Sequence, residues 1–258
     1  MSVMPQKSFL ITGERFIDGG WTASSGAAWS SRGPLEQQEL WSGNWSTPAE
    51  VADAVGSAKK AFAKWRSESL ERRTEICRAF AETVRERKDE LALLIALETG
   101  KPLWEALSET VTVIGKVSAA IDALHARRWT TEEDAGGMRA VTRFHPHGVM
   151  VVLGPFNLPA HLPGAHIVPA LLAGNTIVFK PSEWTPAVGE WLIRAWQAAG
   201  LPPGVLNLIH GQAEAARAAV ADERIDGVFV YRQLPRRGQY SQTTCRSPRN
   251  RLGTRDGR

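Results

Sequence analysis

The chain has 258 residues, of which 43% are hydrophobic and 22% are charged, a composition typical of a globular protein with a substantial core. Two cysteines in this length exclude a disulfide scaffold, and the first 16 residues lack the apolar segment of a signal peptide, so we expect a cytoplasmic protein. The formal net charge of the whole chain is +4, but residues 231–258 alone carry a charge of +7. Residues 1–230 are therefore mildly acidic, with a net charge of −3.

The first half of the chain is predicted to pass from strands to helices. Residues 16–45 are rich in Trp, Ser and Gly, which is typical of short strands joined by turns. A capping box at 47–50, with Pro at the first helical position, predicts the start of a helix. The apolar spacing predicts helices over 48–66, over 70–98 with a break near Lys88, and over 103–125. Together they would form a helical layer over residues 48–125.

The next part of the chain is predicted to be a hairpin followed by alternating strands and helices. Gly136 and Gly137, between two β-prone stretches, predict a hairpin over residues 127–145. The expected strands are 149–153, 176–179, 205–209 and 227–230, and the helices between them are 161–173, 185–199 and 212–221. This alternation is the signature of right-handed βαβ units, so we expect an α/β fold with a parallel sheet over residues 146–230.

Residues 144–179 contain no Asp, Glu, Lys or Arg, and a lack of charged residues is also typical of a membrane span. However, five prolines interrupt the segment, and its continuous apolar pieces are shorter than the roughly 20 residues that a span needs. We therefore expect buried strand, turn and helix here, and no membrane partner.

Residues 231–258 form a basic tail with eight arginines, one aspartate and few apolar side chains. Such a segment cannot bury enough surface to offset its ordering entropy, so it is predicted to be disordered. A basic arm that binds nucleic acid is the functional alternative for this tail.

Polar residues follow the predicted strands, and ligands of open parallel sheets bind beyond the carboxyl ends of the strands. Asn157 lies between two prolines, where its carboxamide could donate a hydrogen bond to an oxyanion; alternatively it stabilises its own turn. Lys180 and Glu183 could bind ribose hydroxyls, or could belong to a solvated strand end. His210 and Gly211 follow the third strand.

Two other kinds of site are not indicated. No GxGxxG motif follows any predicted strand, so the ordinary Rossmann fingerprint is absent. His145 with His147, and His161 with His166, have no carboxylate or Cys at ligand spacing, which favours histidines of turns and helix surfaces over a metal site.

Four segments around the candidate residues resemble the NAD(P)-dependent aldehyde dehydrogenase superfamily. They are GPFNLP (154–159), VPALLAGNT (168–176), FKPSEWTP (179–186) and AGLPPGVLN (199–207). Residues 145–149 and 160–167 are most similar to the members that oxidise N-succinylglutamate 5-semialdehyde in arginine catabolism, and residues 98–102 fit too. The resemblance runs from about residue 16 to residue 230, roughly the first half of a member, with Asn-Leu-Pro in place of the commoner Asn-Phe-Pro.

This resemblance implies an aldehyde-dehydrogenase-like, Rossmann-like domain that binds NAD, and an aldehyde as the substrate of intact members. It implies that Asn157 is the catalytic side chain that stabilises the thiohemiacetal oxyanion. It also implies that Lys180 and Glu183 hold the adenosine ribose, which favours NAD over NADP. The other expected cofactor-binding residues are Pro155, Phe156, Ser182 and Gly211.

The family reaction needs two groups that lie beyond the end of the resemblance. A cysteine thiolate attacks the aldehyde, hydride passes to NAD, and a glutamate activates the water that hydrolyses the thioester. We therefore expect the catalytic domain to be absent and the chain to be inactive by itself. Cys77 is predicted to be half-buried in a helix, and Cys245 lies in the tail, where nothing packed could lower its pKa.

The sequence after Val230 departs from the family. Residues 232–238 stand where members have a Gly-Ser-x-x-x-Gly turn, yet codons for these residues, read one base later, can encode Gly-Ser-Tyr-Arg-Ala-Gly. A frameshift near Val230 explains the basic tail and weakens the nucleic-acid interpretation. The favoured hypothesis is thus a truncated aldehyde dehydrogenase, and the alternative is a non-catalytic nucleotide-binding or assembly module with a basic arm. Family members form homo-oligomers, which we expect less of this chain. In the family, such a hairpin joins a sheet that is completed partly by the missing half and partly by a partner subunit.

Overall fold

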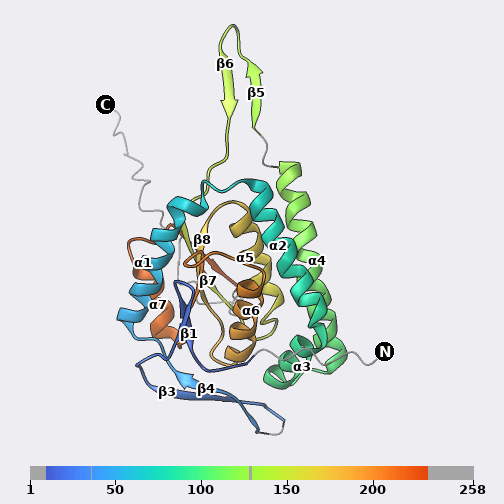
Figure 1. Cartoon of the computed structure of the whole chain (residues 1–258), viewed down its shortest axis with the longest axis vertical. Helices are drawn as coiled ribbons and strands as arrows, with labels where there is room; N and C mark the ends of the chain where they lie inside the picture. The colour runs from blue at the N-terminus through green and yellow to red at the C-terminus, as the bar shows by residue number, and fades with distance from the viewer. Residues whose placement is uncertain (1–9, 36, 128–129, 232–258) are drawn as a thin grey trace, which may run out of the picture.

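A computed structural model describes residues 10–35, 37–127 and 130–231, in which a sheet is enclosed by helices (Figure 1). The strands are β1 (Arg15–Ile17), β2 (Gly20–Thr22), β3 (Ala28–Arg32), β4 (Glu39–Asn44), β5 (Thr131–Asp134), β6 (Arg139–Thr142), β7 (Val149–Leu153), β8 (Thr176–Lys180), β9 (Leu206–Leu208) and β10 (Gly227–Val230). The helices are α1 (Pro48–Trp65), α2 (Leu70–Glu86), α3 (Lys88–Thr99), α4 (Leu103–Arg127), α5 (His161–Leu172), α6 (Pro186–Ala198) and α7 (Ala213–Ala221). The predicted basic tail lies outside the described residues beyond Tyr231, and the division of the chain at residue 230 stays a prediction.

The main sheet has six strands in the order β10-β7-β8-β9-β1-β2. The predicted parallel pairing of β7 and β8 is confirmed, with a register that runs from Val149 opposite Thr176 to Leu153 opposite Lys180. The expectation of a sheet built from residues 146–230 is corrected at one edge. There β1 pairs antiparallel with β9, through Phe16 and Leu208, and β2 extends the sheet beyond β1. The sheet is therefore mixed, and the N-terminal segment completes it.

Helices cover both faces of the sheet (Figure 1). On one face α1 and α7 enclose a small apolar cluster with inward side chains of β7 and β8, including Val151 and Val178. On the other face α5 and α6 pack on the strands, and α2, α3 and α4 pack outside them. Phe80 of α2 stacks on Trp196 of α6 with ring centroids 3.9 Å apart. Burial on both faces explains why β7 is apolar along its whole length.

The ends of the N-terminal helices follow local sequence signals. The capping box is present, because the Thr47 N–H donates to Glu50 Oε2 at 2.8 Å and the Glu50 N–H donates to Thr47 Oγ1 at 3.4 Å. The second predicted helix is divided between α2 and α3 at Arg87, one residue before the expected break. Helix α3 ends at Gly100, whose φ of 74° is a left-handed conformation that favours glycine. This turn places Lys101 at the start of α4.

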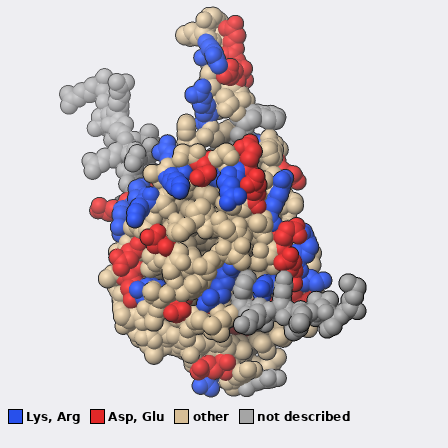
Figure 2. Space-filling model, in the orientation of Figure 1, with Lys and Arg blue, Asp and Glu red and all other residues tan. Residues whose placement is uncertain are grey.

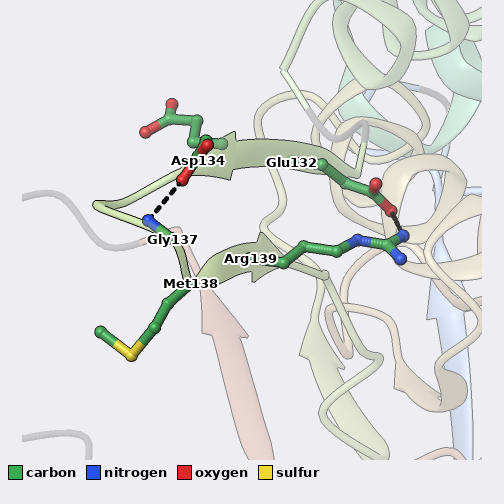
Figure 3. Close-up of a pocket in the computed structure, with 6 residues that line it drawn as sticks. Glu132, Asp134, Gly137, Met138 and Arg139 are labelled. Carbon is green, nitrogen blue, oxygen red and sulfur yellow. Dashed lines mark hydrogen bonds and ion pairs between the residues drawn. The ribbon is translucent and has the colours of Figure 1, made fainter.

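The predicted hairpin is formed by β5 and β6, which pair antiparallel and project from the body of the molecule (Figure 1). At its tip the Gly137 N–H donates to Asp134 Oδ1 at 2.9 Å, and Arg139 pairs with Glu132 (Figure 3). The hollow that these residues line lies on the hairpin itself, and it contains none of the predicted site residues. It is a feature of the turn rather than a candidate site.

Charges of both signs share the surface of the folded body. On the face shown in Figure 2, basic and acidic side chains lie interspersed around a centre that is mostly uncharged. Within the described ranges, no helix combines the length and the apolar character that crossing a membrane requires. The basic character of the sequence therefore resides mainly in the tail.

Candidate functional site

The carboxyl ends of β7, β8 and β9 meet at one edge of the sheet, where the candidate residues follow each strand. The turn after β7 is tied to β8, because the Gly154 N–H donates to the Lys180 carbonyl oxygen at 2.8 Å. The Lys180 side chain reaches the segment after β9, where its Nζ donates to the Gly211 carbonyl oxygen at 2.7 Å. Three segments far apart in the sequence thus form one site, which we call the strand-end corner (residues 154, 180–183 and 211).

Lys180 is buried, with only 6% of its surface exposed. Its Nζ also donates to the Pro181 carbonyl oxygen at 2.8 Å, and Oε2 of Glu183 lies 3.8 Å from Nζ. Burial lowers the pKa of Lys180, and the Glu183 carboxylate opposes this shift. The alternative of a solvated strand end is therefore wrong for Lys180. Because an ammonium group has three N–H donors and two point at carbonyl oxygens, one remains for Glu183 or a ligand oxygen.

The two residues near Lys180 differ in what they offer a ligand. The Glu183 side chain is about one-third exposed, so its carboxylate can accept a hydrogen bond from a molecule in solvent. Ser182 is buried, and its Oγ accepts a hydrogen bond from the Trp184 N–H at 3.3 Å. The structure thus brings Glu183 beside Lys180 and gives Ser182 a role in the local turn, while cofactor binding by Ser182 stays a prediction.

The segment after β9 contains one predicted residue and one that the sequence reasoning left without a role. A Cβ at Gly211 would lie 2.5 Å from Cβ of Ala215, so glycine lets the chain pass close to α7. His210 is buried against Trp41, with ring centroids 4.8 Å apart, and neither of its ring nitrogens forms a hydrogen bond of normal geometry with any described residue. Burial lowers the pKa of His210 to about 3, so the imidazole is neutral.

Asn157 lies in the turn between β7 and α5, with an exposed side chain. Across the described ranges, its carboxamide forms no hydrogen bond, whereas its backbone carbonyl oxygen accepts one from Nζ of Lys101 at 2.8 Å. The interpretation that the Asn157 side chain stabilises its own turn is therefore not supported. Phe156, in the same turn, is 41% exposed, and Pro155 is partly buried. The free carboxamide is available to a ligand.

Lys101 and Glu109 form a buried ion pair next to the Asn157 turn, with Nζ and Oε2 2.9 Å apart. The sequence reasoning used Lys101 only as part of a family motif and missed Glu109. No local signal could have revealed the pair, because the two residues lie eight positions apart around the start of α4 and act on a turn more than 45 positions further on.

A cleft of about 710 Å³ lies beside the Asn157 turn, since Phe156 lines it together with Trp29 and Trp184. Glu98 also lines this cleft; it is buried and accepts hydrogen bonds from the backbone N–H groups of Ala187 and Val188 at 3.0 and 2.9 Å. Burial raises the pKa of Glu98 to about 8. This carboxyl group holds the N-terminus of α6, and we assign it no chemical role.

The structure contains neither a reactive cysteine nor a metal centre within its described residues. Cys77 is 1% exposed rather than half-buried as predicted, because it faces the core between α2 and the other helices. Burial raises the pKa of Cys77 to about 12, which keeps the thiol protonated. Among residues 10–35, 37–127 and 130–231, no group of three or more His, Cys, Asp or Glu side chains could hold a metal ion. Cys245 lies outside these residues.

Comparison with known sequences finds one family and a consistent set of relatives. The aldehyde dehydrogenase family matches residues 21–231. An N-succinylglutamate 5-semialdehyde dehydrogenase from Burkholderia cenocepacia is 48% identical over 216 residues, which are 84% of this chain and 44% of the relative. The protein of the same name from Burkholderia ambifaria is 47% identical over the same shares. The chain thus spans less than half the length of the curated relatives that it matches.

Solved structures share the fold. An NADP-dependent glyceraldehyde-3-phosphate dehydrogenase from Bacillus halodurans, solved with NADP, superposes with a TM-score of 0.80 at 28% identity, covering 85% of this chain and 48% of that one. A cysteine-to-alanine variant of aldehyde dehydrogenase C from Pseudomonas syringae, solved with NAD⁺ and octanal, gives 0.78 at 32% identity, covering 83% and 44%.

Proposed function

This chain belongs to the aldehyde dehydrogenase family, and from that membership we propose that it forms the nucleotide-binding part of an NAD-dependent enzyme that oxidises an aldehyde to a carboxylate. We take N-succinylglutamate 5-semialdehyde or a similar aldehyde as the substrate of the intact enzyme, because relatives with that name are 47% and 48% identical to this chain. We place the intact enzyme in the cytoplasm as a homo-oligomer.

The observation that carries this proposal is the pairing of Lys180 and Glu183 at the strand-end corner. A buried ammonium with a third N–H donor and a carboxylate 3.8 Å away, about one-third exposed, offer a donor and an acceptor to the two hydroxyls of a ribose. The position also fits, because nucleotides bind open α/β sheets beyond the carboxyl ends of the strands. The residues present therefore suit the ribose of a nucleotide, although the chain lacks the GxGxxG motif of other Rossmann-like folds.

The choice of NAD over NADP rests on the charge of Glu183. The similar structures do not distinguish the two cofactors, because one holds NADP and another holds NAD⁺. A carboxylate beside the ribose accepts a hydrogen bond from the 2′-hydroxyl of NAD and repels the 2′-phosphate of NADP. The local charge at the strand-end corner therefore favours NAD.

Asn157 is the residue that we assign to the chemistry itself. Its carboxamide N–H₂ donates to the oxyanion that forms when a thiolate attacks the aldehyde carbon. The donor is free and lies in a turn stiffened by Pro155 and Pro159, so it needs little reorganisation. Bound NAD supplies the hydride acceptor, and we expect Pro155 and Phe156 to contact it.

This 258-residue chain by itself is proposed to be inactive. The covalent step requires a thiolate, and Cys77 is buried with a raised pKa. The chain also has no segment like the family's Glu-Leu-Gly-Gly or Gly-Gln-x-Cys motifs. Oxyanion stabilisation by Asn157 alone cannot replace the nucleophile.

The proposed function is tested in a chimera that adds the part of the relative that this chain does not cover. Residues 10–230 are joined to the remaining part of the Burkholderia cenocepacia relative, and NADH formation is measured with N-succinylglutamate 5-semialdehyde. We expect turnover with NAD, a higher KM for NAD in Lys180→Met, and a kcat lower by about 10²- to 10³-fold in Asn157→Ala. Gln38→Ala, an exposed amide in the segment between β3 and β4, is the control.

The same experiment distinguishes the proposed function from the alternative of a non-catalytic module. A folded chimera that reduces neither NAD nor NADP with any aldehyde, beside an active relative, overturns the proposed function and favours the module. A chimera that prefers NADP overturns only the role given to Glu183.

A further inference from the structure

The Asn157 turn is held at two points, at Asn157 itself and at the start of α5, by side chains from the neighbouring α3–α4 region. Lys101 Nζ donates to the Asn157 carbonyl oxygen at 2.8 Å and to Glu109 Oε2 at 2.9 Å. The other oxygen of Glu109 accepts hydrogen bonds from the backbone N–H groups of Ala160 and His161, at 2.9 and 3.0 Å. One ion pair therefore contacts the backbone both at the oxyanion residue and three to four residues after it.

Glu109 caps the N-terminus of α5, which has no capping side chain in its own sequence. Ala160 precedes the helix and has no side chain that could cap it, and the structure shows no side-chain cap hydrogen bond from that position. A carboxylate from α4 takes this place, and its negative charge also favours the N-terminal end of the helix dipole. Glu109 thereby fixes where α5 starts, and with it the end of the Asn157 turn.

Lys101 holds the same turn at Asn157 itself. Its side chain is 9% exposed and that of Glu109 is 1% exposed, so the pair has been removed from water. Glu105 adds a more distant carboxylate oxygen at 3.7 Å from Nζ. Buried ion pairs are poor sources of stability, because desolvation offsets their attraction. A pair that nonetheless directs one of its donors at a loop carbonyl is better explained by positioning than by stability.

We propose that Lys101 and Glu109 are positioning residues that preset the direction of the Asn157 carboxamide toward the reacting oxygen. The proposal rests on the proposed function, in which Asn157 donates to the oxyanion. A donor stabilises developing charge best when it is already oriented, and here the backbone is held at Asn157 and again at Ala160 while the carboxamide is left free.

The test measures the Asn157 turn in the full chain, without aldehyde or cofactor, by backbone ¹⁵N relaxation and amide exchange. In Lys101→Met we expect the order parameter of Asn157 to fall from about 0.85 to below about 0.6, with the strands β7 and β8 unchanged. Lys101→Arg, which keeps the charge and the donors, should restore it. Lys60→Met, which removes an exposed lysine of α1, is the matched control.

Glu109→Gln is the second variant and decides the matter if Lys101→Met does not fold. It keeps the volume and one oxygen acceptor but removes the ion pair, so we expect exchange at Ala160 and His161 to become about tenfold faster than in the Lys60→Met control. Order parameters and exchange rates equal to that control in the folded variants overturn the proposal. In the chimera, Lys101→Met should lower kcat while KM for NAD stays unchanged. An inactive chimera with the expected relaxation changes contradicts only the proposed function.

Discussion

The Glu98 carboxylate lies at the N-terminus of α6, where its Oε2 accepts a hydrogen bond from the Val188 N–H at 2.9 Å. Its other oxygen accepts from the Ala187 N–H, so one side chain of α3 satisfies two N–H groups that the helix itself leaves unpaired. This contact joins the helical layer to the sheet layer. It also leaves a carboxyl group in the core, which makes its protonation part of the folding equilibrium.

The first prediction is that Glu98 makes stability fall as pH rises. Burial raises the pKa of Glu98 from 4.5 to about 8, so between these values the folded chain keeps a proton that the unfolded chain has lost. The free energy of unfolding should therefore decrease across this window, by up to about 1.4 kcal/mol per pH unit. Urea unfolding of the parent and of Glu98→Gln, with the exposed Glu39→Gln as control, measures this. Equal slopes in all three would contradict the prediction.

The second prediction is that His210 makes the folded chain less stable at low pH, because its pKa is lowered in the folded state. Burial lowers this pKa from 6.5 to about 3, an effect that the nearby charge of Lys180 strengthens and the Glu14 backbone opposes. Below about pH 6.5 the imidazole is protonated in the unfolded chain but stays neutral in the folded chain. The free energy of unfolding therefore falls as pH drops toward about 3.

His210→Phe should therefore flatten the acid side of the stability profile. A phenyl ring keeps the contact with Trp41 and removes two polar nitrogens that the core leaves without hydrogen bonds of normal geometry among the described residues. We expect a gain of about 1 kcal/mol near neutral pH. The exposed His145→Phe is the control in thermal unfolding over a pH series, and a loss of stability in His210→Phe would show that the imidazole has a partner that matters.

The strand–helix alternation after residue 146 was predictable because each element carries its own signal. The apolar run at Val149–Leu153 and the stripe that contains Trp191 and Trp196 each reflect burial of that segment alone. The pairing of Phe16 with Leu208 has no such signal, because contact between residues 192 positions apart depends on how the whole sheet closes. For this reason the antiparallel edge of the sheet was missed.

The same distinction separates the residues of the candidate site. Strand ends can be located from sequence, and this placed Lys180, Glu183 and Asn157 near one edge of the sheet. The burial of Lys180 depends on two carbonyl oxygens, one of them 31 residues away at Gly211, and the sequence therefore left its solvation open. The Glu109 carboxylate likewise acquires its role only where α4 meets α5.

The third prediction is that the chain alone does not reduce NAD with any aldehyde. With the pKa of Cys77 near 12, only about one thiol in 10⁵ is ionised at neutral pH, and the residue is closed to solvent. Absorbance of NADH over hours, with the chimera as positive control, measures turnover. Activity that disappears in Cys245→Ala would show that the second cysteine acts as the nucleophile.

The last prediction is that NAD binds this chain weakly and independently of its basic tail. Lys180 and Glu183 can still hold the ribose, but the segment after Val230 lacks the glycine turn that in the family approaches the cofactor. The loss of several backbone hydrogen bonds, at roughly 1 to 3 kcal/mol each, moves a micromolar site into the millimolar range. Saturation-transfer NMR detects such binding, and Lys180→Met should abolish it while Lys60→Met does not. Deletion of residues 232–258 should change the Kd by less than about twofold. Micromolar binding in calorimetry that disappears with the deletion would instead make the arginine-rich tail part of the site.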